Sequence, residues 1–351
     1  MREVVEALRG IPDQLLLDPD AERLVDQVYA RLGRFDYEGI AVHAPRVVNL
    51  DQQAELPLVL ASRETAARSR RVVLGDSCFV AVTQLETGQF WTGPCFAPPP
   101  EKVPMWTEPG AAAPPSTEGL GEAAATHVVE RIELRERLGL ELQTGHYAIT
   151  VFAYDWRSNT SLVKVTGGDA APPRRWPAQE ALAVLQSYQR EGPSGAVFPD
   201  FRRSPYSPPL QGTGVSVNVP RSWSVDAGEL PLHAAFMMAM PEAWLVAPLS
   251  QDALGDLSPE ESTLYTDLPQ ALVPMVVLLT RREVPSPIRL ELKVPVAAPA
   301  AIKAGETGEG WLSVDLATAF AAPPEPGVYG VYVLAGPYVG GPQPLRVEAE
   351  Q

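Results

Sequence analysis

Short apolar runs with alternating side chains recur along most of this chain, and they predict many β-strands joined by turns. The clearest run, TGHYAITVFAY at 144–154, begins at a turn glycine and alternates with period two, as a half-buried strand does. Two more apolar stretches, 232–240 and 271–279, are too short to span a bilayer and predict buried strands. In the first half of the chain, strands are predicted at 39–50, 56–62, 78–85, 128–136, 145–155 and 161–166.

Two segments have a helical pattern instead. Residues 1–35 form a predicted N-terminal helical segment, in which Asp18 caps a helix that ends at Gly33. A shorter helix is predicted at 177–191. One face of the N-terminal helix is apolar, and we expect it to pack on a sheet. That face consists of Leu24, Val28 and Leu32.

The chain also contains two copies of one pattern. GIAVHAPRVVNLD at 39–51 matches GVSVNVPRSWSVD at 214–226, and both lead into Glu-Leu-Pro-Leu. Further on, IELRERLGLELQTGHYAITV at 132–151 matches VDLATAFAAPPEPGVYGVYV at 314–333. Two matching blocks in the same order indicate a tandem duplication of one β-domain. The predicted organisation is a helical segment at 1–35, a first sandwich at 36–168 with a proline-rich insertion at 96–119, a connector at 169–212 and a second sandwich at 213–351.

The second matching block has a known counterpart. PGVYGVYV at 326–333 resembles the penultimate-strand region of bacterial immunoglobulin-like domains, which reads P-G-x-Y-x-V-x-V, and TGHY at 144–147 follows it less closely. The resemblance implies a mainly β fold of two tandem immunoglobulin-like β-sandwiches. It also implies a structural role for Tyr147 and Tyr329 at a corner of each sandwich. The cysteine pair and strand-C tryptophan of antibody domains are not evident here.

Composition and charge limit the kinds of partner and the cellular compartment that we expect. The 351 residues carry a formal net charge of −15, which makes nucleic-acid binding a poor expectation and favours a basic protein partner. The first residues lack the long apolar run of a secretory signal, and we expect no membrane association. Two cysteines provide no disulfide framework, so the cytoplasm is the expected compartment. A bridge between Cys78 and Cys95 is the alternative.

The sequence predicts no catalytic, cofactor or metal site. The four histidines are scattered, and neither His-Glu-x-x-His nor Cys-x-x-Cys occurs. The alternative is a hydrolase in which Ser77, in a Gly-Asp-Ser turn, attacks an acyl carbonyl. That alternative lacks the downstream Asp-x-x-His that such esterases carry, and CFVAVTQL after Ser77 has the pattern of a strand rather than a helix.

Two sets of residues are candidates for specific roles. A repeated Arg and Asp pair is predicted to form an ion pair or to brace a turn, and it consists of Arg46 and Asp51 in the first copy and Arg221 and Asp226 in the second. Interleaved aromatic and arginine residues are typical of interface anchors, and the candidate partner-binding residues are Trp91, Trp106, Arg174, Arg175, Trp176, Arg202, Arg203 and Tyr206. The alternative for the arginines is that they tether the connector to acidic surfaces of the sandwiches.

The sequence therefore favours a non-enzymatic protein-binding or assembly protein. Its partner would be another protein or a second copy of itself, and neutralising a basic toxin is one role that fits the charge. An exported cell-surface adhesin is a further alternative.

Overall fold

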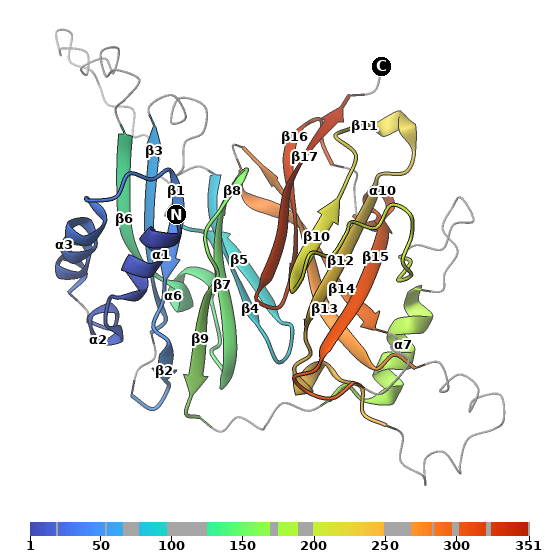
Figure 1. Cartoon of the computed structure of the whole chain (residues 1–351), viewed down its shortest axis with the longest axis horizontal. Helices are drawn as coiled ribbons and strands as arrows, with labels where there is room; N and C mark the ends of the chain where they lie inside the picture. Colours follow the sequence, from blue (N-terminus) through green and yellow to red (C-terminus); the bar gives the residue numbers. More distant parts are fainter. Residues whose placement is uncertain are drawn as a thin grey trace.

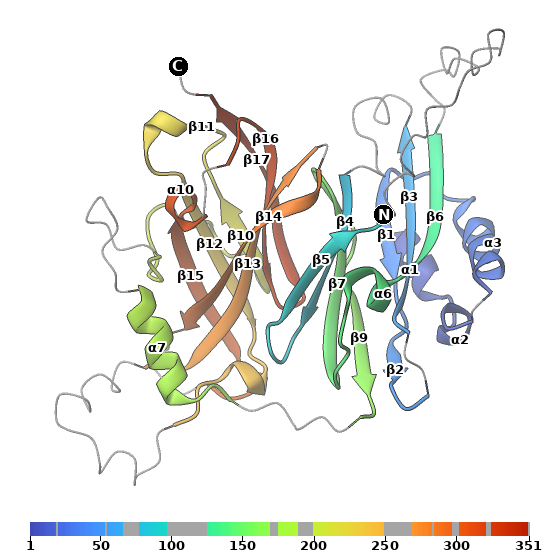
Figure 2. The same ribbon diagram turned by 180° about the vertical axis from the view of Figure 1, so that it is seen from behind.

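The computed structural model describes residues 1–18, 20–52, 55–65, 77–96, 125–168, 175–188, 199–248, 268–282, 284–296, 302–320 and 324–349. Strands predominate, and they form four sheets that lie one behind another across the molecule (Figure 1). Helices cover one end of this stack, and the helix α7 (Ala178–Tyr188) lies near the other end (Figure 2). The predicted fold class is confirmed as a mainly β chain with two tandem sandwiches, an N-terminal helical segment and a connector helix.

The first sandwich contains β1 (Gly39–His43), β2 (Val47–Asn49), β3 (Pro57–Thr65), β4 (Cys78–Gln84), β5 (Phe90–Pro94), β6 (Ala125–Glu133), β7 (Gly145–Ala153), β8 (Trp156–Arg157) and β9 (Ser161–Thr166). One sheet has the strand order β1-β3-β6, and all its pairs are antiparallel. The other sheet has the order β2-β9-β7-β4-β5, with β8 paired to β7. The apolar core lies between these two sheets.

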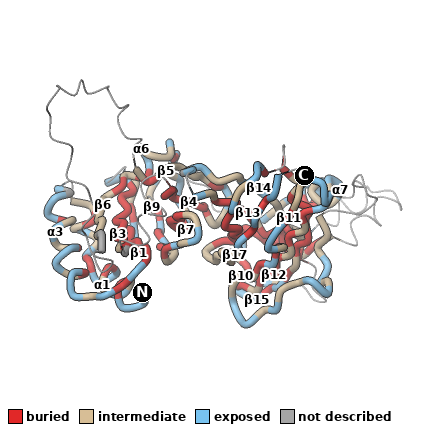
Figure 3. The backbone as a smooth tube through the Cα atoms, turned by 90° about the horizontal axis from the view of Figure 1, so that it is seen from above, coloured by how far each residue is buried: buried red, intermediate tan, exposed pale blue. Residues whose placement is uncertain are grey.

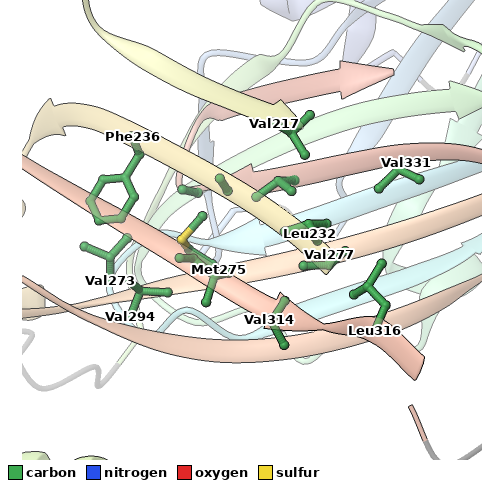
Figure 4. Close-up of a cluster of buried hydrophobic side chains, with 14 of the residues drawn as sticks. Val217, Leu232, Phe236, Val273, Met275, Val277, Val294, Val314, Leu316 and Val331 are labelled. Carbon is green, nitrogen blue, oxygen red and sulfur yellow. The ribbon is translucent and has the colours of Figure 1, made fainter. Parts of the chain in front are cut away.

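The second sandwich contains β10 (Gly214–Asn218), β11 (Ser222–Ser224), β12 (Pro231–Ala239), β13 (Ala271–Arg281), β14 (Val284–Val296), β15 (Thr307–Asp315), β16 (Gly327–Ala335) and β17 (Tyr338–Glu348). Its sheets have the orders β10-β12-β15 and β11-β17-β16-β13-β14. Side chains from both sheets fill the space between them, as the inward-pointing valines and leucines in Figure 4 show. Truncating one of these to alanine typically costs about 2–5 kcal/mol.

The two sandwiches share a distinctive crossover near their beginning. The strand predicted as one element over 39–50 is in fact two, because Pro45 lacks a backbone N–H and ends β1. The chain then crosses to the opposite sheet, where β2 pairs in parallel with β9. The second copy does the same after Pro220, since β11 pairs in parallel with β17. This shared connectivity is what a tandem duplication predicts.

A short helix follows the third strand of the first sheet in both copies. The strand predicted over 128–136 ends earlier, at Glu133, because that side chain accepts a hydrogen bond from the Arg135 N–H at 3.3 Å and caps α6 (Leu134–Leu138). In the second copy Asp315 accepts from the Ala317 N–H at 3.0 Å and caps α10 (Leu316–Ala319). The prediction extended the strand too far because it overlooked this cap.

Three N-terminal helices cover the outer face of the β1-β3-β6 sheet, namely α1 (Arg2–Arg9), α2 (Asp13–Leu16) and α3 (Ala21–Leu32). The predicted stripe of Leu24, Val28 and Leu32 is buried against that face. The predicted cap was wrong by two residues: Asp20 accepts from the Arg23 N–H at 3.3 Å, whereas Asp18 accepts from Asp20 and closes the preceding turn. The connector helix α7 (Ala178–Tyr188) lies within the predicted range.

The two sandwiches pack back to back through the outer faces of their larger sheets (Figure 3). The first contributes Phe79 on β4 and Phe152 on β7, which lie opposite each other in register. The second contributes Val276 on β13 and Leu334 on β16, which occupy the matching pair of positions. Equivalent faces therefore meet, as in the isologous interface of a symmetric dimer.

Polar contacts at the edges of this interface fix its geometry. The Tyr332 hydroxyl donates to the Tyr154 and Trp156 carbonyls at 3.0 and 3.2 Å. Its ring meets Phe152 edge-on, with centroids 4.8 Å apart. Elsewhere along the interface the Trp244 indole N–H donates to the Leu85 carbonyl at 2.5 Å. Pairing of these buried groups makes the relative placement of the two sandwiches specific.

Candidate functional site

A surface at the far end of the second sandwich brings together three of the predicted partner-binding residues, Arg202, Arg203 and Tyr206. They lie in the segment 199–213, which precedes β10 and is attached to the outer side of the β10-β12-β15 sheet. Asp200 exchanges two backbone hydrogen bonds with Ser313 on β15, at 2.8 and 2.7 Å. That short bridge attaches the segment to the edge of the sheet.

A tight turn presents Tyr206. The Ser207 N–H donates to the Ser204 carbonyl at 3.1 Å, and the Ser204 N–H donates to the Ser207 hydroxyl at 2.9 Å. Ser204 and Pro205 are favoured at the first two positions of such a turn, because the serine oxygen can satisfy nearby N–H groups and proline fixes φ. The turn therefore sets the direction of the Tyr206 backbone before any partner binds.

The Tyr206 ring is both exposed and held in place. It stacks on the His233 ring of β12, with centroids 5.5 Å apart and planes 26° from parallel. The Tyr206 backbone carbonyl accepts a hydrogen bond from the Asn218 side chain of β10 at 3.4 Å. Tyr206 as a whole is nevertheless 68% exposed, the largest fraction among the large apolar residues that the structure describes. An aromatic ring that is ordered yet uncovered loses little conformational freedom when it binds.

Two arginines directly precede this turn. Arg202 donates to the Asp200 carboxylate from both its backbone N–H and its guanidinium, each at 3.1 Å, and its side chain is 86% exposed. Arg203 is exposed as well. The Arg202–Asp200 pair is open to solvent and contributes little to stability, but it holds the Arg202 guanidinium against the Asp200 carboxylate. We define the Tyr206 surface as Arg202, Arg203 and Tyr206, supported from below by His233.

His233 also contacts a hydroxyl group, which raises the question of catalysis. Its Nδ1 lies 2.8 Å from the Ser313 hydroxyl, and burial lowers the pKa of the imidazole. A nucleophilic serine needs a base that is in turn oriented by a third group. Across the described parts of the chain, His233 forms no ion pair with a carboxylate, and Ser313 is 5% exposed. The arrangement is that of a neutral histidine supporting an aromatic ring.

The remaining candidate partner-binding residues lie elsewhere. Trp91 of β5 is half-buried, packing on the first core and against Tyr147. Arg175 pairs with Glu242 at 2.6 Å, and Trp176 forms a parallel bridge with Val246 and lies under the Lys293 ammonium group. These contacts join this part of the connector to the second sandwich. Trp106 and Arg174 fall outside the described residues.

The repeated Arg and Asp residues make separate contacts. The Arg46 guanidinium donates to the Arg9 carbonyl at 3.2 Å, toward the N-terminal helices. Asp51 instead accepts from the Gly168 N–H at 3.3 Å, after β9. In the second copy Arg221 accepts a backbone hydrogen bond from Arg346, and Asp226 lies exposed in a short 3₁₀ turn. In the first copy the Arg46 carbonyl likewise accepts from the Lys164 N–H, at 2.8 Å, so the two copies share this backbone contact and differ in their side-chain contacts.

The tyrosines singled out by the resemblance occupy equivalent corners. The Tyr147 hydroxyl donates to the Gln143 carbonyl at 2.9 Å, and the Tyr329 hydroxyl donates to the Glu325 carbonyl at 2.7 Å. Sequence reasoning missed a second equivalent pair, Glu133 and Asp315. Each carboxylate also accepts the N–H of the leucine in Glu-Leu-Pro-Leu, at 2.7 Å in both copies. The acid recurs at the same offset as the tyrosines, which was the signal available in the sequence.

The hydrolase alternative places its nucleophile in the interior. Ser77 directly precedes β4 and is 1% exposed. Within the described residues, no cluster of three or more His, Cys, Asp or Glu side chains could hold a metal ion. None of the described helices combines the length and apolar character that crossing a membrane requires.

Comparisons with known proteins add little. No protein-family model matches the chain, and no curated protein matches it. One solved structure, a bacterial adhesin from Mobiluncus mulieris containing intramolecular disulfide, isopeptide and ester bond cross-links, is 9% identical. The alignment covers 89% of this chain and 99% of that chain, with a TM-score of 0.15. A score that low carries no argument about fold or function.

Proposed function

We propose that this chain is a non-enzymatic protein-binding protein, and that it contacts its partner through the Tyr206 surface. The observation that carries the proposal is that Tyr206 is 68% exposed as a residue while its ring stacks on His233. Tyrosine and arginine are the residue types enriched at the energetic centres of interfaces. A tyrosine ordered by its neighbours is suited to that role because little rotamer entropy remains to be lost.

The partner is a protein or a second copy of this chain. The net charge of −15 favours a basic partner during long-range encounter. At the contact itself, Arg202 and Arg203 would take carboxylate or carbonyl groups of the partner. Neutralising a basic toxin and serving as an assembly subunit are the roles that fit these properties. The proposal includes an immunoglobulin-like kind of sandwich, in keeping with the two tyrosine corners, and a cytoplasmic location.

Affinity capture from the native cell tests this proposal when variants are compared side by side. The full chain is used as bait in three forms: wild type, Tyr206→Ala, and the double variant Arg202→Ala with Arg203→Ala. Tyr29→Ala serves as the matched control, because Tyr29 is an exposed tyrosine on α3 of the other sandwich. We expect one protein to be retained by wild type and Tyr29→Ala and reduced at least about tenfold by either surface variant, as for an interface hot spot.

Sedimentation of the purified chain measures its oligomeric state and so tests whether the partner is a second copy. A wild-type dimer that Tyr206→Ala converts to a monomer would identify a second copy as the partner. Equal capture by wild type and both surface variants, with no change in oligomeric state, would contradict the proposed surface.

A further inference from the structure

The chain has two cysteines, and the fold places them directly opposite each other. Cys78 is the first residue of β4, and Cys95 immediately follows β5. The register pairs Phe79 with Pro94, and the Cys95 N–H donates to the Cys78 carbonyl at 3.0 Å. Opposed residues of this hydrogen-bonded kind have Cα atoms about 5.5 Å apart, within the range of about 4.4–6.8 Å that a disulfide spans.

Both cysteine side chains belong to the core of the first sandwich. Each residue is 0% exposed and belongs to the apolar cluster between the two sheets. The register places these two side chains opposite each other on adjacent strands. The structure therefore holds the two sulfurs as neighbours in the form with free thiols.

The second copy shows that packing alone does not require cysteine at these positions. Phe79 pairs with Phe152 in the first copy, as Val276 pairs with Leu334 in the second, so Cys78 corresponds to Met275. Met275 in turn pairs with Leu292 on β14, which is the position equivalent to Cys95. Methionine and leucine fill the same space in one sandwich. In the other, both cysteines of the whole chain occupy it together.

Other roles for the pair fit less well. The thiols lie too deep for a substrate to reach a nucleophilic sulfur, and burial raises the pKa of the Cys78 thiol, with the Cys95 thiol adding to the effect. No described cluster of three or more potential ligands could hold a metal here. What remains is chemistry between the two sulfurs themselves.

We propose that Cys78 and Cys95 are a disulfide-forming site, oxidised by a small disulfide such as glutathione disulfide while the chain folds. One cysteine thiolate attacks glutathione disulfide, forming a mixed disulfide and releasing one glutathione. The second thiolate attacks the protein sulfur of that mixed disulfide, forming the Cys78–Cys95 bond and releasing the second glutathione. The protein loses two hydrogens and is oxidised, and glutathione disulfide is reduced to two glutathione molecules.

Burial determines when this reaction occurs. A bulky disulfide reagent reaches either sulfur only before the two sheets close on each other, so the bridge forms during folding and not afterwards. A chain that folds under reducing conditions, as in the cytoplasm, keeps two protected thiols, and the bridge forms only where folding takes place in the presence of the oxidant. The bridge would join β4 to β5 directly before the proline-rich insertion, and β4 also carries Phe79 at the contact between the two sandwiches.

The test compares two orders of addition on the full chain. One sample is folded under reducing conditions, exchanged into buffer without reductant and then exposed to glutathione disulfide. The other is unfolded, reduced and refolded in a glutathione redox buffer. Both are then denatured without reductant, alkylated with iodoacetamide and weighed as intact protein by mass spectrometry. We expect two alkylated cysteines in the first sample. In the second we expect an unalkylated monomer that is lighter by two hydrogens than the reduced, unalkylated chain.

Variants and a stability measurement complete the test. Cys78→Ala and Cys95→Ala each leave one thiol, which should emerge from refolding alkylated or carrying glutathione, and never bridged. The bridged protein should unfold about 5 °C above the reduced form, because the closed loop restricts the unfolded chain. Refolded wild type with two alkylated or two glutathione-bearing cysteines would overturn the proposed site. Rapid bridging of the folded, reduced sample would overturn the proposed timing.

Discussion

Tyr147 and Tyr329 make the same hydrogen bond in the two sandwiches, each donating its hydroxyl to the carbonyl four residues earlier. The donor–acceptor distances are 2.9 Å to Gln143 and 2.7 Å to Glu325. Burial raises the pKa of both phenols, so both hydroxyls remain protonated donors at neutral pH. Two residues separated by a constant offset in sequence thus do the same structural work in two copies of one fold.

Removing either hydroxyl should destabilise the protein. In Tyr147→Phe and Tyr329→Phe, the ring stays in its core and the hydrogen bond to the carbonyl is lost, which costs about 1 kcal/mol. Tyr147→Phe also loses the bond that its hydroxyl accepts from the Gln143 N–H at 2.9 Å, so its loss should be the larger of the two. Urea unfolding measures the change. Tyr206→Phe, whose exposed hydroxyl lies outside both cores, is the control and should unfold like wild type. A loss confined to one of the two corner variants would argue against their equivalence.

The repeated acid should matter more than the repeated tyrosine. Asp315 is 3% exposed and accepts hydrogen bonds from the Leu230 and Ala317 N–H groups and from the Thr318 hydroxyl. Asp315→Ala leaves buried donors without acceptors, and we expect a loss of about 3 kcal/mol. The exposed Asp226→Ala is the matched control and should stay within about 0.5 kcal/mol of wild type in the same urea titration.

Stability should fall as the pH drops below the ordinary histidine range. Burial lowers the pKa of His43 below 6.5, with the Arg46 and Arg9 charges lowering it further against contributions from Ile11 and Asp13. The unfolded chain then binds a proton that the folded chain does not, so this stabilisation is present above pH 6.5 and is lost as the pH falls toward the folded value. The free energy of unfolding should show that decline between pH 7.5 and 6, above the range in which Glu130 and Glu133, whose pKa values are raised by burial, act in the opposite direction.

A variant taken from the second copy isolates the contribution of this histidine. His43→Asn introduces the residue that occupies the equivalent position, Asn218. The decline with pH should become shallower, while His127 and His233, whose pKa values are also lowered by burial, retain their share. An unchanged slope in the variant would show that His43 does not titrate differently in the folded state.

Local patterns predicted most of the sandwich architecture. Alternation along TGHYAITVFAY identified β7, and the repeated blocks identified the second copy, because both signals reside in neighbouring residues. Helix capping was misplaced at Asp18 because two aspartates lie within reach of one helix start. The strand predicted over 39–50 was too long because Pro45, which has no backbone N–H to donate, interrupts it.

Contacts between distant segments could not be read in the same way. Strand β4 is buried along its whole length. Apolar residues occur on both of its faces, which indicates that both faces are covered. Nothing local to β4 tells which surface covers the second face. The stacking of Tyr206 on His233 likewise depends on how the segment 199–213 folds over the sheet. Sequence reasoning selected Tyr206 by residue type and missed the histidine that holds it.

The central structural claim is that two copies of one sandwich meet through equivalent faces and behave as one body. Differential scanning calorimetry of wild type, Phe152→Ala and Ile149→Ala tests it most directly. Phe152 points into the contact between the sandwiches, whereas Ile149, on the same strand, points into the first core. Each truncation should cost about 3–5 kcal/mol. The account predicts one cooperative transition for wild type and Ile149→Ala, and separated transitions for Phe152→Ala. Two independent transitions already present in wild type, unaffected by Phe152→Ala, would contradict it.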